Sequence, residues 1–197
     1  MRLSWHTSIL AGDFLFCKTH FHELQECFIT FNSTYDNPDI GDERNFIGIR
    51  ERGTRNLWSS NFEVFPGKEY VIRLYIHNNA SADSGLIAEN VRAMINLPNT
   101  TGKVIDVNSF IESSNSTPNL IWDGIRIYSD RIFNVAYVKG SARFCNNHWG
   151  SDGICIPDTI LTIQGARLGY DELNGLIPSG VGYAGYLTIV VRPQFAE

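Results

Sequence analysis

The sequence lacks several features that would identify common function classes. It carries 16 Lys and Arg against 21 Asp and Glu, a net charge of −5, so it has no basic excess to attract nucleic acid or an anionic membrane. No apolar run approaches the roughly 20 residues of a membrane-spanning helix. Phosphate-binding loops and the Gly-x-Ser-x-Gly and His-Glu-x-x-His motifs are missing. We therefore expect no nucleic-acid partner, no membrane span and no catalytic activity.

Cysteine is scarce, and no Cys-x-x-Cys pair is present, which argues against a zinc ribbon or a thioredoxin-like site. The cysteines are Cys17, Cys27, Cys145 and Cys155. They allow three disulfide pairings, of which 17–27 with 145–155 is the simplest for a secreted protein. Four ordinary thiols in a reducing compartment remain the alternative.

A clear signal peptide is also missing, because Asp13 interrupts the short apolar run near the N-terminus. Residues 1–27 differ in composition from the rest and are expected to form an N-terminal arm or extension. Residues 28–197 are expected to form one β-sandwich domain. We expect an extracellular or cell-surface location on the grounds of that domain.

The composition favours strands, with 17 Gly and few helix-forming runs. The sequence shows no alternation of strands with helices of 10–15 residues, which argues against a doubly wound α/β fold. Short β-type segments separated by turn signals predict an all-β, antiparallel, immunoglobulin-like sandwich with long loops. The predicted strands are 28–31, 46–51, 61–65, 69–79, 86–98, 102–110, 120–128, 133–138, 159–163 and 186–191.

The segment 69–79 shows this pattern most clearly. Apolar side chains alternate along it, so one face of the strand is expected to enter the core and the other to be half polar. The core face consists of Tyr70, Ile72, Leu74 and Ile76. Residues 158–161 and 171–175 are expected to hold brief helical turns.

An ordered set of weak motifs resembles a known kind of domain. The motifs are Pro66-Gly67, Asn78-Asn79, Ala88-x-Asn90-Val91, Leu97-Pro98 and Asp36-Asn37-Pro38. Their order across residues 28–192 is similar to the conserved-repeat, immunoglobulin-like domains of bacterial surface and cell-wall proteins. The resemblance implies a secreted β-sandwich with no catalytic residues to carry over.

A loop rich in carboxylates is a candidate calcium site, formed by Asp36, Asp39, Asp42 and Glu43. Calcium takes six to eight oxygen ligands from such loops, although the spacing is not that of an EF-hand. The alternative is that these side chains cap turns and pair with neighbours. Arg44 is expected to be buried and held by carboxylates.

Exposed aromatic residues and glycosylation sequons are further candidates. Trp149 lies in a predicted loop and is a candidate for ligand contact, whereas Trp122 lies in a predicted strand and is expected in the core. Sequons occur at Asn32, Asn79, Asn99 and Asn115, which would accept glycans only in a eukaryotic secretory pathway.

These features predict an extracellular structural or adhesive module that acts through its surfaces, with other surface proteins or copies of itself as partners. One alternative is a filament subunit whose strand-like segments 12–16 and 27–31 add to an open sheet edge of a neighbour. Another alternative is a module that binds carbohydrate or calcium. Apart from calcium, no cofactor is expected.

Overall fold

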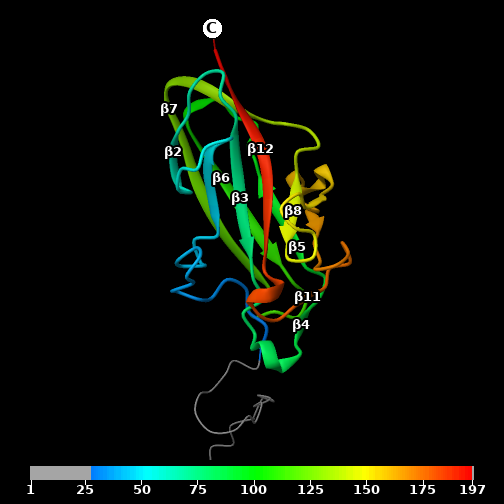
Figure 1. The fold of residues 1–197 in the computed structure, drawn as a ribbon. Helices are drawn as coiled ribbons and strands as arrows, with labels where there is room; N and C mark the ends of the chain where they lie inside the picture. The colour runs from blue at the N-terminus through cyan, green and yellow to red at the C-terminus, as the bar shows by residue number, and fades with distance from the viewer. Residues whose placement is uncertain (1–27, 197) are drawn as a thin grey trace, which may run out of the picture.

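The computed structural model describes residues 28–196 (Figure 1). Residues 1–27, and with them Cys17, Cys27 and the predicted arm, lie outside the described residues. No helix among residues 28–196 is long and apolar enough to cross a bilayer. The chain consists of strands joined by turns and short 3-10 helices. This confirms the all-β, mostly antiparallel class.

The elements follow one another along the chain as β1 (Ile47–Glu51), β2 (Asn61–Glu63), β3 (Tyr70–Ile76), η1 (Ala82–Ser84), β4 (Ile87–Ala88), β5 (Arg92–Asn96), β6 (Gly102–Glu112), β7 (Leu120–Tyr137), β8 (Arg143–Asn146), β9 (Ile154–Cys155), η2 (Asp158–Leu161), β10 (Ala166–Arg167), β11 (Ile177–Pro178), η3 (Val181–Tyr183) and β12 (Gly185–Phe195). Strands β4 and β11 form a separate two-stranded sheet. The other strands belong to one hydrogen-bonded sheet with the order β1-β3-β12-β7-β6-β5-β10, in which β2 joins β7 and β8 joins β12.

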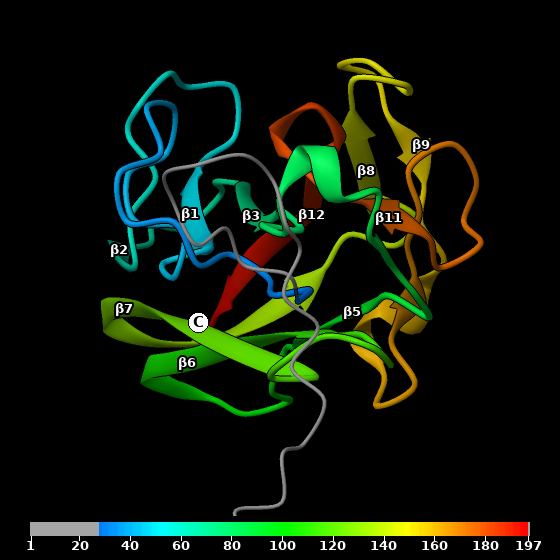
Figure 2. The same ribbon diagram turned by 90° about the horizontal axis from the view of Figure 1, so that it is seen from below.

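This sheet folds into two layers, one containing β1, β3 and β8 and the other containing β5, β6 and β7 (Figure 2). Strand β12 connects them. Its residues 185–191 pair with β3, and its residues 191–195 pair with the end of β7. Every strand pair is antiparallel except β2 with β7. A bridge between Ile49 and Ser59 links β1 to the segment leading into β2. Because β2 pairs with β7, hydrogen bonds connect the β1 edge of the sheet back to β7.

The core follows the predicted alternation of β3. Tyr70, Ile72, Leu74 and Ile76 have no exposed surface. The opposite face of β3 was expected to be half polar, but Tyr75 and His77 on that face are buried. The reason is that the loop before β1 and the ring of Tyr186 pack on this face: the Tyr75 hydroxyl accepts from Asn37 Nδ2, its ring centre lies 5.2 Å from that of Tyr186, and His77 Nδ1 lies 2.9 Å from Glu43 Oε1.

Two predicted strands are wrong, those over residues 28–31 and 159–163. Residues 28–31 form only isolated bridges, Ile29 with Ser116 and Phe31 with Asn78. Residues 159–163 overlap the 3-10 helix η2, as the alternative of a helical turn at 158–161 had anticipated. Segments 120–128 and 133–138 are strands as predicted, but they belong to one continuous strand, β7, which passes from its pairing with β6 to its pairing with β12.

Candidate functional site

The predicted calcium ligands do not converge. Glu43 is completely buried, whereas Asp36 and Asp39 are exposed and Asp42 binds the guanidinium of Arg44 at 2.6 Å. Within residues 28–196, no three His, Cys, Asp or Glu side chains gather as metal ligands would. Of the four carboxylates in this loop, only that of Glu43 lies in the interior.

Glu43 is the acceptor of a buried hydrogen-bond network. Its Oε1 accepts from Asn37 Nδ2 at 2.7 Å and lies 2.9 Å from His77 Nδ1, and its Oε2 accepts from Asn79 Nδ2 at 2.7 Å. Burial raises the pKa of Glu43, but the hydrogen bonds from His77, Asn79 and Asn37 outweigh burial and the pKa is lowered. The network joins the loop before β1 to the end of β3.

A Glu–His pair can act as an orienter and general base in enzymes, but only where the imidazole reaches a substrate. Here the His77 side chain is 9% exposed and the Glu43 side chain is 0% exposed. His77 Nε2 is buried, and no hydrogen bond from a described residue reaches it. The Glu43–His77 pair therefore suits a structural role, in which it holds the loop before β1 against the end of β3.

Arg44 is not buried, contrary to expectation. Its side chain is 55% exposed, and its guanidinium lies 4.1 Å from the centre of the Tyr35 ring. Asp42 accepts hydrogen bonds from the backbone N–H and the guanidinium of Arg44. The buried member of this loop is the adjacent Glu43. Asp42 and Tyr35 instead hold Arg44 in place on the surface.

A hollow of about 400 Å³ lies beside Tyr35 and Arg44, and we call it the aromatic groove. Its lining comes from the segment before β1 and from the start of β7. The lining residues are Phe31, Asn32, Ser33, Tyr35, Arg44, Phe46, Leu120, Ile121 and Trp122. Phe31 and Phe46 are buried, whereas Trp122 and Tyr35 are 66% and 67% exposed. The prediction that Trp122 lies in the core is therefore wrong.

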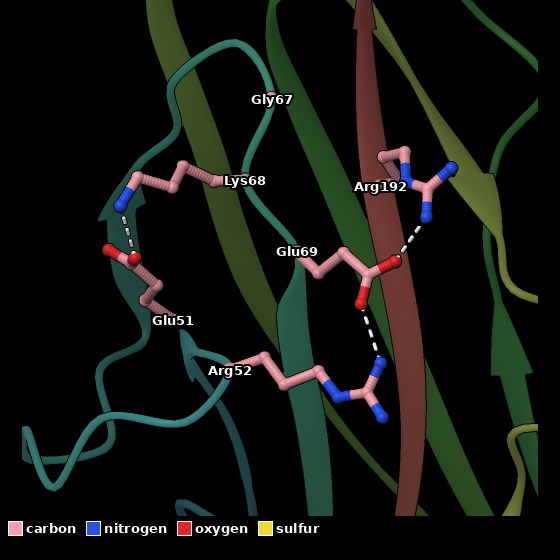
Figure 3. Close-up of a pocket in the computed structure, with 6 residues that line it drawn as sticks. All are labelled: Glu51, Arg52, Gly67, Lys68, Glu69 and Arg192. Carbon is pink, nitrogen blue, oxygen red and sulfur yellow. Dashed lines mark hydrogen bonds and ion pairs between the residues drawn. The ribbon is translucent and has the colours of Figure 1, made fainter.

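A second hollow, of about 570 Å³, lies at the ends of β1, β3 and β12 (Figure 3). Its side chains satisfy one another: Lys68 pairs with Glu51 at 2.6 Å, and Glu69 accepts from both Arg52 and Arg192. The hydrogen bonds from Arg192 and Arg52 lower the pKa of Glu69. Exposed pairs of this kind contribute little to stability. With both carboxylates engaged, this hollow has few free groups for a ligand.

Two arginines share one indole ring on the outer face of the β1–β3 layer. The guanidinium groups of Arg50 and Arg73 lie 4.2 and 4.3 Å from the centre of the Trp58 ring, and Arg73 also lies 4.9 Å from that of Tyr186. Burial lowers the pKa of Arg73. Gly48 leaves room for the indole, because a Cβ there would lie 3.0 Å from Trp58 Cβ. Sequence reasoning did not anticipate this stack.

Trp149 does not join the aromatic groove. It is half-buried and packs against the core, and its ring centre lies 4.6 Å from that of His148. Its backbone N–H donates to Asn146 Oδ1, which fixes the turn after β8. Among residues 28–196 the exposed tryptophan is Trp122, whereas the sequence analysis expected Trp149 in that role.

The four sequon asparagines differ in their exposure and in their hydrogen bonds. Asn32 is 2% exposed, and its side chain bonds to the backbone of Tyr75 and His77. The amide of Asn79 donates to Glu43, and that of Asn115 bonds to the backbone of Ile87 and Glu89. Asn99 is exposed in the loop before β6. Glycan attachment at the first three would disrupt these bonds.

Cys145 and Cys155 are free thiols on the hairpin of β8 and β9, so the predicted 145–155 disulfide is not formed in this structure. Cys145 Sγ is within hydrogen-bond distance of Ser151 O, at 3.4 Å. Burial, followed by the charge of Asp152, raises the pKa of the Cys145 thiol. Cys155 is exposed.

We therefore expect Cys155 to react with iodoacetamide several-fold faster than Cys145 in the native chain, because thiolate fraction and access both govern alkylation. Mass spectrometry of peptides after timed quenching measures both rates. In urea the two rates should become similar. Equal rates in the native chain, or a 145–155 disulfide in a non-reduced digest, would contradict this expectation.

The chain matches no protein-family model, no curated protein and no solved structure.

Proposed function

We propose that the chain is a non-catalytic, extracellular structural or adhesive module that contacts its partner through the aromatic groove. The observation that carries the proposal is the exposure of Trp122 and Tyr35 on a hollow whose floor includes the buried rings of Phe31 and Phe46. Large exposed apolar side chains gathered around a hollow mark interaction surfaces. Trp and Tyr are also the residues that most often dominate binding energy.

The electrostatics of the aromatic groove suit recognition of a neutral surface. Arg44 is neutralised by Asp42 and lies over Tyr35, so the cation orients the ring and adds little net charge. The immunoglobulin-like identity and the kinship with bacterial surface domains form part of this proposal. They are supported by two mostly antiparallel layers and by the motif order in the sequence.

Carbohydrate binding is the second candidate function. The exposed rings of Trp122 and Tyr35 favour it, because aromatic faces stack on the apolar faces of sugars and the neighbouring Ser33 and Arg44 offer polar groups. The two candidates share one site and differ in the chemistry of the partner.

Trp122→Ala should weaken binding through the aromatic groove by about ten-fold or more, because it removes the largest exposed ring of the site. Surface plasmon resonance would measure binding of the full chain to immobilised copies of itself and to immobilised cellulose, chitin and mannan oligosaccharides. Leu57→Ala is the control, since Leu57 is 88% exposed and does not line the groove. Equal binding by Trp122→Ala and the wild type on every surface would contradict the proposal.

A further inference from the structure

Strand β7 has an open edge where it borders the aromatic groove. The N–H of Arg126 donates to Ser60 O, and the C=O of Tyr128 accepts from Val64 N. Backbone groups alternate in direction along a strand, and the pairing of β6 with β7 is continuous from Leu120 to Tyr128. The N–H and C=O groups of Leu120 and Trp122 therefore point away from β6, toward the same edge.

No strand or bridge among residues 28–196 pairs with this edge at Leu120 or Trp122. The next residue on the same edge, Gly124, donates its N–H to the carboxylate of Asp123. The open stretch is therefore short and ends at Asp123, whose Oδ2 also accepts from Ile47 N of β1. Such an edge is a template for an added strand.

The aromatic groove supplies a place for the side chains of an added strand. Alternate side chains of a strand point to opposite faces, so every second one could enter the hollow above Phe31 and Phe46 while the backbone bonds to β7. Backbone bonds then give affinity, and the apolar hollow selects the side chains.

We propose that the aromatic groove accepts residues 12–16 of a second copy of the chain as an added β-strand. This inference rests on the proposed function and names the partner at the same site. In an extended conformation Phe14 and Phe16 share one face, which matches the apolar lining of the hollow. Leu15 then lies on the opposite face.

The described part of the chain narrows the choice of donor. The other strand-like segment, 27–31, is already engaged, since Ile29 and Phe31 are buried and bridge to Ser116 and Asn78. Residues 17–27 extend to at most about 40 Å, enough to reach a neighbouring molecule.

The test uses the full chain under reducing conditions, with p-benzoylphenylalanine in place of Phe14. Unlabelled and ¹⁵N-labelled copies are mixed and irradiated, and cross-linked peptides are identified by mass spectrometry. We expect cross-links that join light and heavy copies and that end in residues 31–46 or 119–124. Cross-links confined to one copy, cross-links elsewhere on the surface, or none at all would overturn the proposal.

Sedimentation velocity gives a second measurement on the same chain. Phe14→Asp should weaken self-association by ten-fold or more, whereas the matched control Leu15→Asp should weaken it several-fold less. Equal effects of the two variants would count against strand addition in this register.

The two proposals fail in different ways. If Trp122→Ala reduces binding to an oligosaccharide but Phe14→Asp leaves self-association unchanged, the groove binds another partner and strand addition is wrong. If Phe14→Asp reduces self-association but Trp122→Ala has no effect on any surface, the aromatic groove is not the binding site and both the acceptor assignment and the proposed function are wrong.

Discussion

Glu43→Ala should lower the free energy of unfolding by about 3–5 kcal/mol, because removing one partner of a buried charged network leaves the others without an acceptor. The carboxylate has no exposed surface, and its oxygens serve Asn37, Asn79 and His77. The variant also leaves a cavity at the contact between the loop and β3. Urea unfolding followed by Trp fluorescence at pH 7 measures the change.

Glu43→Gln separates charge from shape in the same experiment. The amide keeps one acceptor oxygen but turns a donor toward neighbours that donate, so an intermediate loss of stability is expected. Asp42→Asn is the matched control, since it removes the adjacent carboxylate of an exposed ion pair with Arg44. Its unfolding midpoint should stay close to that of the wild type. A larger effect at Asp42 than at Glu43 would contradict the buried-network interpretation.

The pKa of Glu43 also predicts how this contribution depends on pH. The folded-state pKa is lowered from its ordinary value of 4.5, so the unfolded chain takes up the proton at higher pH than the folded chain does. The stabilisation is therefore complete above the unfolded pKa and is lost as pH falls through the folded pKa. The stability gap between wild type and Glu43→Gln should narrow below about pH 4.5. A gap that is unchanged between pH 7 and pH 3 would refute this.

Much of the fold could be predicted from local patterns. Period-two alternation located β3, because one of its faces packs into the core, and β-type segments between turn signals located β1, β6 and β12. The bend of β7 could not be predicted, since Ser129-Asp130-Arg131 has the composition of a turn. Those residues remain in the strand because β12 takes over the pairing at Phe133.

The candidate site was less predictable, because its parts are distant in sequence. Glu43 is buried by partners 34 and 36 residues away, His77 and Asn79, and nothing local distinguishes it from Asp42. Trp122 carried a usable signal: it shares a face with Gly124 and Arg126, while the buried Ile125 and Ile127 occupy the other face. That alternation indicates an outward ring, and the expectation of a core tryptophan was wrong for this reason.

Phe133→Ala should destabilise the chain by about 3–5 kcal/mol, the usual cost of deleting a buried aromatic ring. Phe133 is 1% exposed and lies where β6, β7 and β12 meet, opposite both Gly102 and Phe195. Its ring stacks on that of Phe195 with centres 5.5 Å apart. The same substitution therefore weakens the pairing of β12 with β7, through which β12 connects the two layers.

Chemical unfolding of three further variants, Ile132→Ala, Phe195→Ala and the double variant Phe133→Ala with Phe195→Ala, distinguishes this junction effect from a general loss of apolar surface. Ile132→Ala, at a neighbouring position that is 54% exposed, should change stability by no more than about 0.5 kcal/mol. Phe195→Ala combined with Phe133→Ala should show a coupling of about 0.5–1.5 kcal/mol, as expected for stacked rings in contact. Additive losses would show that the rings do not stabilise each other. Equal losses at Ile132 and Phe133 would show that the junction does not depend on the buried ring.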